Sequence, residues 1–194
     1  RGQDPFVEAR RYTEGSSRAA LAEIEARIRT AGTSDRAELE RELLAVLEDA
    51  AATPDARGWA CRMLRIIGTS RSVPGLAAAL GDSRVALDAV GALRGIPGSS
   101  ADDALRRALG KASGAPQLAI IEALGSRRVE AAVPDLLRLV RTGPRQVTEA
   151  ALHALGQVGT RAALLGLRDS KVARESAAAR ELALLAAAGA AVTR

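Results

Sequence analysis

A repeat of about 30 residues constrains the fold of this chain more than any other feature of its sequence. Leucines that close a short helical stretch recur 29, 31 and 31 residues apart: Leu64, Leu93, Leu124 and Leu155. A second set of apolar positions recurs at the same intervals: Leu76 and Leu80, Leu105 and Leu109, Leu136 and Val140. Two independent sets with one period predict stacked repeats, because a single repeat cannot bury its apolar side alone.

The apolar residues inside each repeat are spaced as on a helix. Val133, Leu136, Leu137 and Val140 stand at i, i+3, i+4 and i+7, which places them on one helical face. Hydrophobic residues make up 47% of the chain but aromatic residues only 2%, so aliphatic side chains must form the core. Such a core suits closely packed helices better than strands. The sequence therefore predicts an all-α fold, a right-handed α-solenoid of stacked antiparallel helix pairs.

We expect one domain over residues 1–194, because no linker long enough to separate two domains is visible. Residues 1–52 are expected to form N-terminal capping helices and residues 53–168 the core repeats. Residues 169–194 are expected to form a final helix, and the abrupt end at Arg194 suggests a truncated or continuing array. The expected elements are an N-terminal segment at 4–12 and helices at 17–31, 35–52, 54–67, 72–80, 83–94, 99–109, 115–124, 129–141, 144–156, 160–168 and 170–188.

Polar residues and glycines mark the expected helix ends. N-terminal caps are predicted at Asp35, Thr53, Ser72 and Asp82, since short polar side chains accept hydrogen bonds from the first free N–H groups. Pro54 follows one of these caps and suits a first helical turn. Left-handed backbone at helix C-termini is predicted for four glycines: Gly68, Gly125, Gly156 and Gly159.

The stretch from Leu136 to Gly156 carries a resemblance to a known family. It reads LLRLVRTGPRQVTEAALHALG, an apolar helix and a short turn followed by a segment close to V-R-x-A-A-x-A-L-G. This pattern resembles the HEAT-repeat superfamily, particularly its short-repeat branch related to the phycobilisome-lyase HEAT-like modules. The resemblance covers roughly residues 35–188 and implies a fold, with repeats of about 30 residues, but no activity.

The chain departs from that family pattern at several positions. Thr148 and Ala86 stand where the family has an arginine, so a salt-bridge ladder between repeats is expected to be incomplete. Asp88 falls in a column that Trp59 and alanines otherwise occupy. Two interpretations of Asp88 stay open: it serves as a ligand or an anchor for an arginine, or a rotated helix exposes it to solvent.

Motifs for catalysis and cofactor binding are missing from the sequence. His153 is the only histidine and Cys61 the only cysteine, so neither a metal cluster of these residues nor an intrachain disulfide can form. No phosphate-binding loop, HExxH motif or calcium loop is present. We therefore expect a chain that is not an enzyme and that binds neither a metal nor a cofactor.

Basic charge is concentrated after the first 50 residues. Residues 1–50 contain 8 arginines and 11 carboxylates, whereas residues 51–194 contain 20 basic and 12 acidic residues. HEAT-like DNA glycosylases combine an α-solenoid with a basic groove, so nucleic-acid binding in such a groove is the alternative function. Those enzymes also use tryptophans around the damaged nucleotide, and Trp59 is the only tryptophan here. Enrichment of arginine on a solvated surface is the competing explanation of the charge.

The favoured interpretation is a non-catalytic scaffold that binds a protein or peptide on the concave wall formed by the second helix of each pair. These second helices are expected at 54–67, 83–94, 115–124, 144–156 and 170–188. Alignment on the leucine set brings polar residues of those helices into shared columns. The candidate binding residues are Arg57, Arg62, Arg65, Gln117, Glu122, Thr148, Glu149 and His153.

The sequence indicates the partner and the compartment of the protein only in outline. A protein or peptide partner is expected, with nucleic-acid binding weak at most and a monomeric state. The longest apolar run, Leu182 to Val192, covers eleven residues and is too short to span a bilayer. The compartment is left open between the cytoplasm and export, since no disulfide is needed and the chain begins with Arg1 instead of Met.

Overall fold

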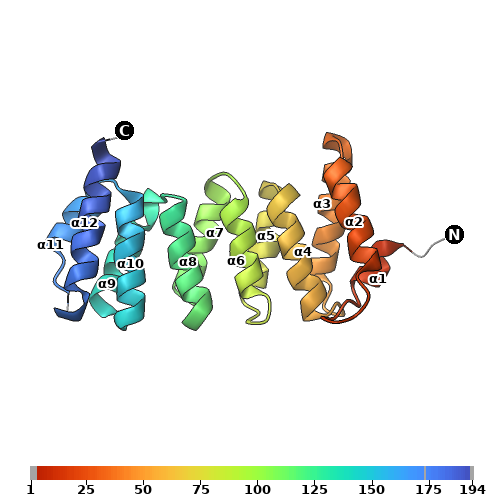
Figure 1. The fold of residues 1–194 in the computed structure, drawn as a ribbon, viewed down its shortest axis with the longest axis horizontal. Helices are drawn as coiled ribbons and strands as arrows, with labels where there is room; N and C mark the ends of the chain where they lie inside the picture. The colour runs from red at the N-terminus through yellow and green to blue at the C-terminus, as the bar shows by residue number, and fades with distance from the viewer. Residues whose placement is uncertain (1–3, 173, 193–194) are drawn as a thin grey trace. The chain divides into compact units, whose positions relative to one another are not determined.

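The structure is a computed structural model that describes residues 4–172 and 174–192. Within those residues all regular secondary structure is helical, and turns and loops connect the helices, as Figure 1 shows. This confirms the prediction of an all-α fold of stacked helix pairs. The α-helices are α1 (Pro5–Ala9), α2 (Ala19–Thr30), α3 (Thr33–Glu48), α4 (Pro54–Ile67), α5 (Val73–Ala79), α6 (Ala86–Gly95), α7 (Ser99–Leu109), α8 (Gly114–Ser126), α9 (Val133–Thr142), α10 (Arg145–Val158), α11 (Arg161–Asp169) and α12 (Ala177–Val192). Three 3₁₀ turns precede α5, α9 and α12: η1 (Ser70–Ser72), η2 (Glu130–Ala132) and η3 (Arg174–Ser176).

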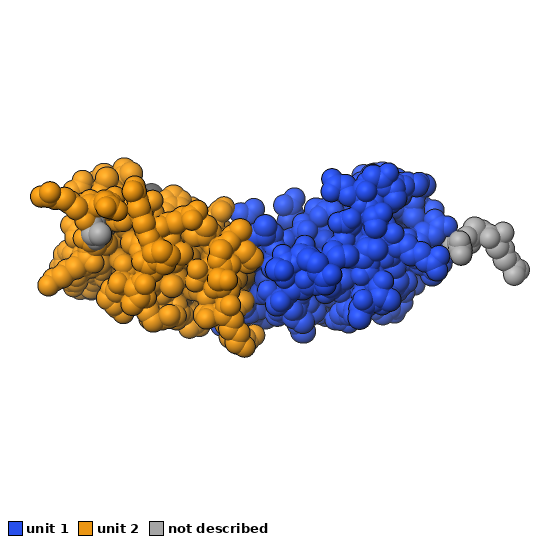
Figure 2. All heavy atoms as spheres, turned by 90° about the horizontal axis from the view of Figure 1, so that it is seen from below, with its two compact units in different colours: residues 1–104 blue, residues 105–194 orange. Residues whose placement is uncertain are grey.

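The chain forms two compact units, Arg1–Ala104 (unit 1) and Leu105–Arg194 (unit 2), coloured separately in Figure 2. The boundary falls within α7. Each unit has its own packed helix pairs. The expectation of one continuous domain over residues 1–194 stays a prediction.

In unit 1, the first helices α3 and α5 pack against the second helices α4 and α6, and α4 lies beside α6. The two members of the predicted leucine set that lie in this unit, Leu64 and Leu93, are fully buried. Trp59 is also buried, and its indole N–H donates to Glu25 Oε1 at 3.0 Å. A buried indole needs such a partner, because an unpaired N–H inside the core would be costly.

In unit 2, the second helices α8, α10 and α12 lie side by side in one layer, and α9 and α11 pack against them (Figure 1). Two glycines allow this close approach. A Cβ atom at Gly125 of α8 would lie 2.7 Å from Ala154 Cα of α10, and one at Gly156 would lie 3.1 Å from Ala183 Cα of α12. Helix backbones can approach this closely only where one side has no side chain.

The expected role of the glycines at helix ends is therefore largely wrong. Gly159 does end α10 with left-handed backbone (φ +62°), but Gly68 ends α4 with extended backbone. Gly125 and Gly156 lie inside helices and serve the close packing described above. The left-handed position after α8 belongs instead to Arg128, with φ +55°. A left-handed turn needs φ > 0 but does not strictly require glycine.

The predicted N-terminal caps have different outcomes. Thr53 caps α4 as predicted, since its hydroxyl accepts from Ala56 N–H at 3.1 Å. Asp35 is not a cap but lies in the first turn of α3, where its negative charge interacts favourably with the helix dipole. Ser72 precedes α5 without capping it, because its hydroxyl donates to the buried Glu40 at 2.6 Å. Asp82 accepts from Arg84 N–H in the turn before α6.

Candidate binding furrow on the second helices of unit 2

A furrow of about 680 Å³ runs between α8 and α10 in unit 2. Both helices contribute side chains at helical spacing, so one face of each helix forms one wall. The residues that line it are Ala115, Leu118, Ala119 and Glu122 of α8, and Gln146, Ala150, His153 and Gln157 of α10. We refer to these eight residues as the furrow.

The furrow combines an apolar wall with a few polar groups. Leu118, Ala119 and Ala150 are half-buried, and the small alanine side chains leave the space open. Glu122 and His153 are exposed. This combination of apolar surface and few directional groups is typical of a site that binds another molecule.

Two predicted site residues, Glu122 and His153, line the furrow together. They hold the same position relative to the buried leucines Leu124 and Leu155 on neighbouring helices. The repeat therefore brings them to facing walls, although they are 31 residues apart in the sequence.

Three other predicted residues of unit 2 lie elsewhere. Gln117 is half-buried on α8 and does not line the furrow. Thr148 is only 7% exposed, and its hydroxyl donates to the carbonyl of Gly143 at 3.1 Å, so it serves the turn before α10. Glu149 forms an ion pair with Arg145 one turn earlier on α10, at 2.8 Å.

The equivalent position in unit 1, between α4 and α6, is crossed by an ion pair. Arg62 Nη1 lies 3.0 Å from Asp88 Oδ1. Gly58 makes room for this pair, since a Cβ atom there would lie 2.6 Å from Asp88 Oδ2. Asp88 is thus half-buried and anchors an arginine, which decides between the two interpretations of this residue. Arg65, the third predicted residue of α4, is exposed and packs beside Gly95 of α6. A Cβ atom added at Gly95 would lie only 3.0 Å from Arg65 Cγ.

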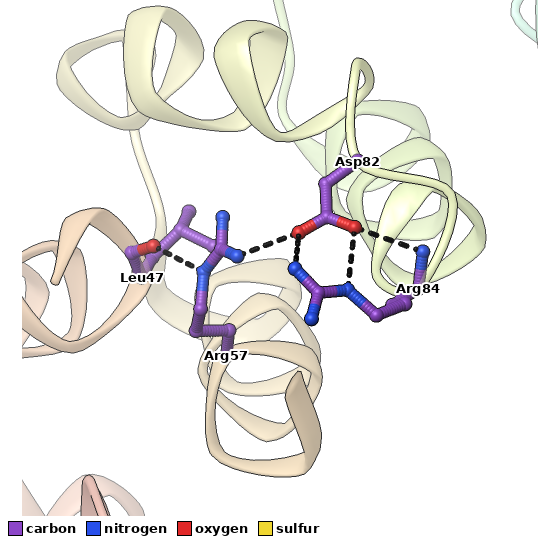
Figure 3. Close-up of polar contacts among 4 residues, drawn as sticks. All are labelled: Leu47, Arg57, Asp82 and Arg84. Atoms are coloured by element: carbon purple, nitrogen blue, oxygen red, sulfur yellow. Dashed lines mark hydrogen bonds and ion pairs between the residues drawn. The ribbon is translucent and has the colours of Figure 1, made fainter. Parts of the chain in front are cut away.

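Arg57, the remaining predicted residue, belongs to a polar cluster at the start of α4 (Figure 3). Its Nε donates to the carbonyl of Leu47 at 2.9 Å, and its Nη1 donates to Asp82 Oδ2 at 2.7 Å. Arg84 donates to both oxygens of the same carboxylate. Hydrogen bonds from Arg84, followed by that from Arg57, hold the pKa of Asp82 well below its ordinary value.

The Arg57–Asp82 contact joins two successive repeats, as a rung of the expected salt-bridge ladder would. At the matching positions, Ala86 has no charge, and the Thr148 hydroxyl is already hydrogen-bonded within its own turn. Arg57 therefore stabilises the stack of unit 1 through both of its contacts.

Cys61 of α4 is fully buried, and we expect its thiol to be unreactive in the folded state. Burial, with a smaller contribution from the negative charge of Asp88, raises the pKa of the Cys61 thiol to about 12. The thiolate is the nucleophilic form, so a thiol with so high a pKa is inert near neutral pH.

The described residues hold no group of three or more His, Cys, Asp or Glu side chains arranged to bind a metal ion. None of the described helices has both the length and the apolar character that crossing a bilayer requires.

The remaining furrow residues were not predicted from the sequence: Ala115, Leu118, Ala119, Gln146, Ala150 and Gln157. A signal for two of them exists in the repeat. The column that holds Trp59 and Asp88 in unit 1 holds Ala119 and Ala150 in unit 2, and two small residues on facing helices leave space between them.

The geometry defines the class of protein as an all-α helical-repeat protein. No protein-family profile matches the sequence, and no curated protein matches it. Among solved structures, the chain is similar to human deoxyhypusine hydroxylase, with 18% identity over 97% of this chain and 89% of that chain and a TM-score of 0.46. It is also similar to the complex of CpcE and CpcF of phycocyanin lyase from Nostoc sp. PCC7120, with 19% identity over 90% of this chain and 89% of that chain and a TM-score of 0.45. These matches are consistent with a HEAT-like helical repeat fold.

The expectation that the chain is not an enzyme is contradicted by the same matches. The first similar protein is named a hydroxylase and the second a lyase. The expectation rested on missing sequence motifs, and such motifs identify only the reaction types that carry them. It is therefore withdrawn.

Proposed function

We propose that the chain is a binding scaffold that takes a protein or peptide segment in the furrow between α8 and α10. The observation that carries this proposal is the furrow itself, an open space of about 680 Å³ between two packed helices with an apolar wall and polar side chains. A site of this kind suits a segment that inserts small apolar side chains and hydrogen-bonds at the rim.

The comparison between the two units supports the same conclusion. In unit 1 the charged pair of Arg62 and Asp88 crosses the equivalent position, whereas unit 2 has Ala119 and Ala150 in that column. Small side chains on facing helices leave apolar surface accessible, and accessible apolar surface at a concave position favours a partner.

The character of the furrow favours a polypeptide over a nucleic acid. None of its eight residues is an arginine, a lysine, a phenylalanine, a tyrosine or a tryptophan, and Glu122 contributes a negative charge. Nucleic-acid grooves use basic residues on the phosphates and aromatic residues on the bases. The alternative of a basic groove finds no support in these residues.

The proposal can be tested by selecting peptides from a random display library on the complete chain. Selected peptides are then measured against the double variant A119L/A150L, in which two isobutyl groups fill the furrow. We expect at least a tenfold loss of affinity, because the apolar wall is no longer accessible.

Ala162→Leu is the matched control, since Ala162 is an exposed alanine on the first helix α11 of the same unit. Peptides should bind this variant as they bind the parent. Equal binding of the selected peptides to A119L/A150L and to the parent would show that the furrow is not the binding site.

A further inference from the structure

The first helices of unit 2 carry a strong excess of positive charge that the furrow does not use. From Leu105 onward, α7, α9 and α11 contain six arginines and two aspartates: Arg106, Arg107, Arg138, Arg141, Arg161 and Arg168, with Asp135 and Asp169. The second helices α8, α10 and α12 contain two arginines and three glutamates: Arg145 and Arg180, with Glu122, Glu149 and Glu181. Charge in unit 2 is therefore divided between its two layers.

Register places four of these arginines along one path across three helices. The buried pair Leu105 and Leu109 of α7 matches Leu136 and Val140 of α9, so Arg107 and Arg138 occupy equivalent positions. The pair Leu136 and Val140 in turn matches the buried Ala163 and Leu167 of α11, so Arg141 and Arg168 are also equivalent. Arg138 and Arg141 lie one turn apart on α9. The path thus runs from Arg107 through Arg138 and Arg141 to Arg168.

Neighbouring helices are held side by side along this path. Arg106 Nε lies 3.6 Å from Asp135 Oδ2, which joins α7 to α9. Leu137 of α9 fills the space beside Gly166 of α11, where no Cβ could fit. Packed helices lie roughly 8–10 Å apart, and positions one turn apart lie about 5–6 Å apart. The helix positions that carry the four arginines therefore follow one another at steps of this size.

All four arginines of the path are exposed and only partly neutralised. Arg138 is 51% exposed beside Asp135, and Arg168 is 65% exposed beside Asp169. No ion pair of the described residues involves Arg107 or Arg141. Ion pairs this exposed are weak and exchange readily for contacts to another anion.

We propose that this arginine path binds the phosphate backbone of a nucleic acid without reading its sequence. A phosphodiester chain offers closely spaced charges, and the planar guanidinium group matches phosphate oxygens in pairs. The path has no aromatic side chain for stacking on bases. A membrane-binding surface would combine cations with several large apolar side chains, and on these helices only Leu165 is a large exposed apolar residue among those described.

The test is fluorescence anisotropy of a labelled random-sequence duplex of about 20 base pairs, titrated with the complete chain at several salt concentrations. Four phosphate contacts give a slope of about −3.6 in log K against log salt, so affinity falls about a hundredfold between roughly 50 and 200 mM salt. The variant R107Q/R138Q/R141Q/R168Q should lose the binding and most of this slope.

The control variant R11Q/R29Q/R36Q/R41Q removes the same charge from exposed positions of unit 1 and should keep the parent's slope. Circular dichroism checks that both variants fold. Equal losses in both variants would reduce the effect to net charge and overturn the proposal. Unchanged binding by the first variant would overturn it too, as would binding to phosphatidylserine vesicles or salt-sensitive self-association without any binding to the duplex.

Discussion

Two glycine-to-alanine substitutions test the packing of the second helices, because the same chemical change should act in opposite directions. Gly125 of α8 faces α10 at close range, whereas a Cβ atom at Gly91 of α6 would meet no heavy atom within 4 Å. Gly91 lies in the interior of α6 and Gly125 lies one residue before the end of α8, and within a helix alanine is favoured over glycine by up to about 1 kcal/mol. Gly91→Ala should therefore stabilise the protein by about that amount.

At Gly125 the steric cost exceeds the gain in helix propensity. The new Cβ would lie 2.7 Å from Ala154 Cα, 2.8 Å from Ala154 Cβ and 2.5 Å from Gln157 Oε1. The two atoms of Ala154 are a backbone Cα and a Cβ, and neither can move away by rotation about a side-chain bond. Overpacking costs about 1–3 kcal/mol, and contacts this short place Gly125→Ala at the upper end, so the variant should be destabilised by about 2 kcal/mol after the propensity gain.

Urea and thermal denaturation followed by circular dichroism measure both effects. For a chain of this size 1 kcal/mol corresponds to about 2–4 °C in Tm, so Gly91→Ala should raise the Tm by that amount. Gly125→Ala should lower it by about 4–8 °C on the same scale. A Gly125→Ala variant as stable as the parent would show that α8 and α10 can move apart freely, and the account of Gly125 as a packing position would then be wrong.

Three further predictions concern single residues. Arg128→Gly should raise the free energy of unfolding by about 0.5–1 kcal/mol, because Arg128 has φ +55°, a conformation that glycine adopts without strain. The control Arg138→Gly lies inside α9 and should lower the free energy of unfolding. Asp82 has a pKa lowered by Arg84, so its contribution to stability is present above about pH 4 and declines as the pH falls further. Asp82→Asn should therefore lose stability at pH 7, and its deficit against the parent should narrow in acid; a deficit independent of pH would contradict this. Cys61 should react with a thiol reagent at pH 8 only after unfolding, because burial raises its pKa to about 12, and rapid labelling of the folded chain would refute its enclosure.

The sequence by itself determined the local structure and the repeat. The leucines Leu64, Leu93, Leu124 and Leu155 are all fully buried, as their spacing predicts. Helical periodicity is local information, since the residues of one face lie within a few turns of one another. Thr53 could be recognised as a cap for the same reason, because its partner is the N–H group three residues later.

The candidate site was predicted only in part. Alignment on the repeat brought Glu122 and His153 into one column, and both line the furrow. The same alignment could not show that Thr148 turns its hydroxyl toward Gly143, or that Arg57 is bound to Leu47 and Asp82. A column gives a residue's position along its helix, whereas its exposure depends on side chains from other segments.

Only the tertiary structure decided how closely the helices approach and where space remains between them. Gly125 and Gly156 look like helix ends in the sequence, yet they are contact points between helix backbones. Asp88 crosses from α6 to α4 because Gly58 leaves room for its carboxylate, and the matching alanines of unit 2 leave the furrow open instead. The physical reason is that the distance between two helices depends on the summed size of the side chains between them, and those side chains come from segments about 30 residues apart.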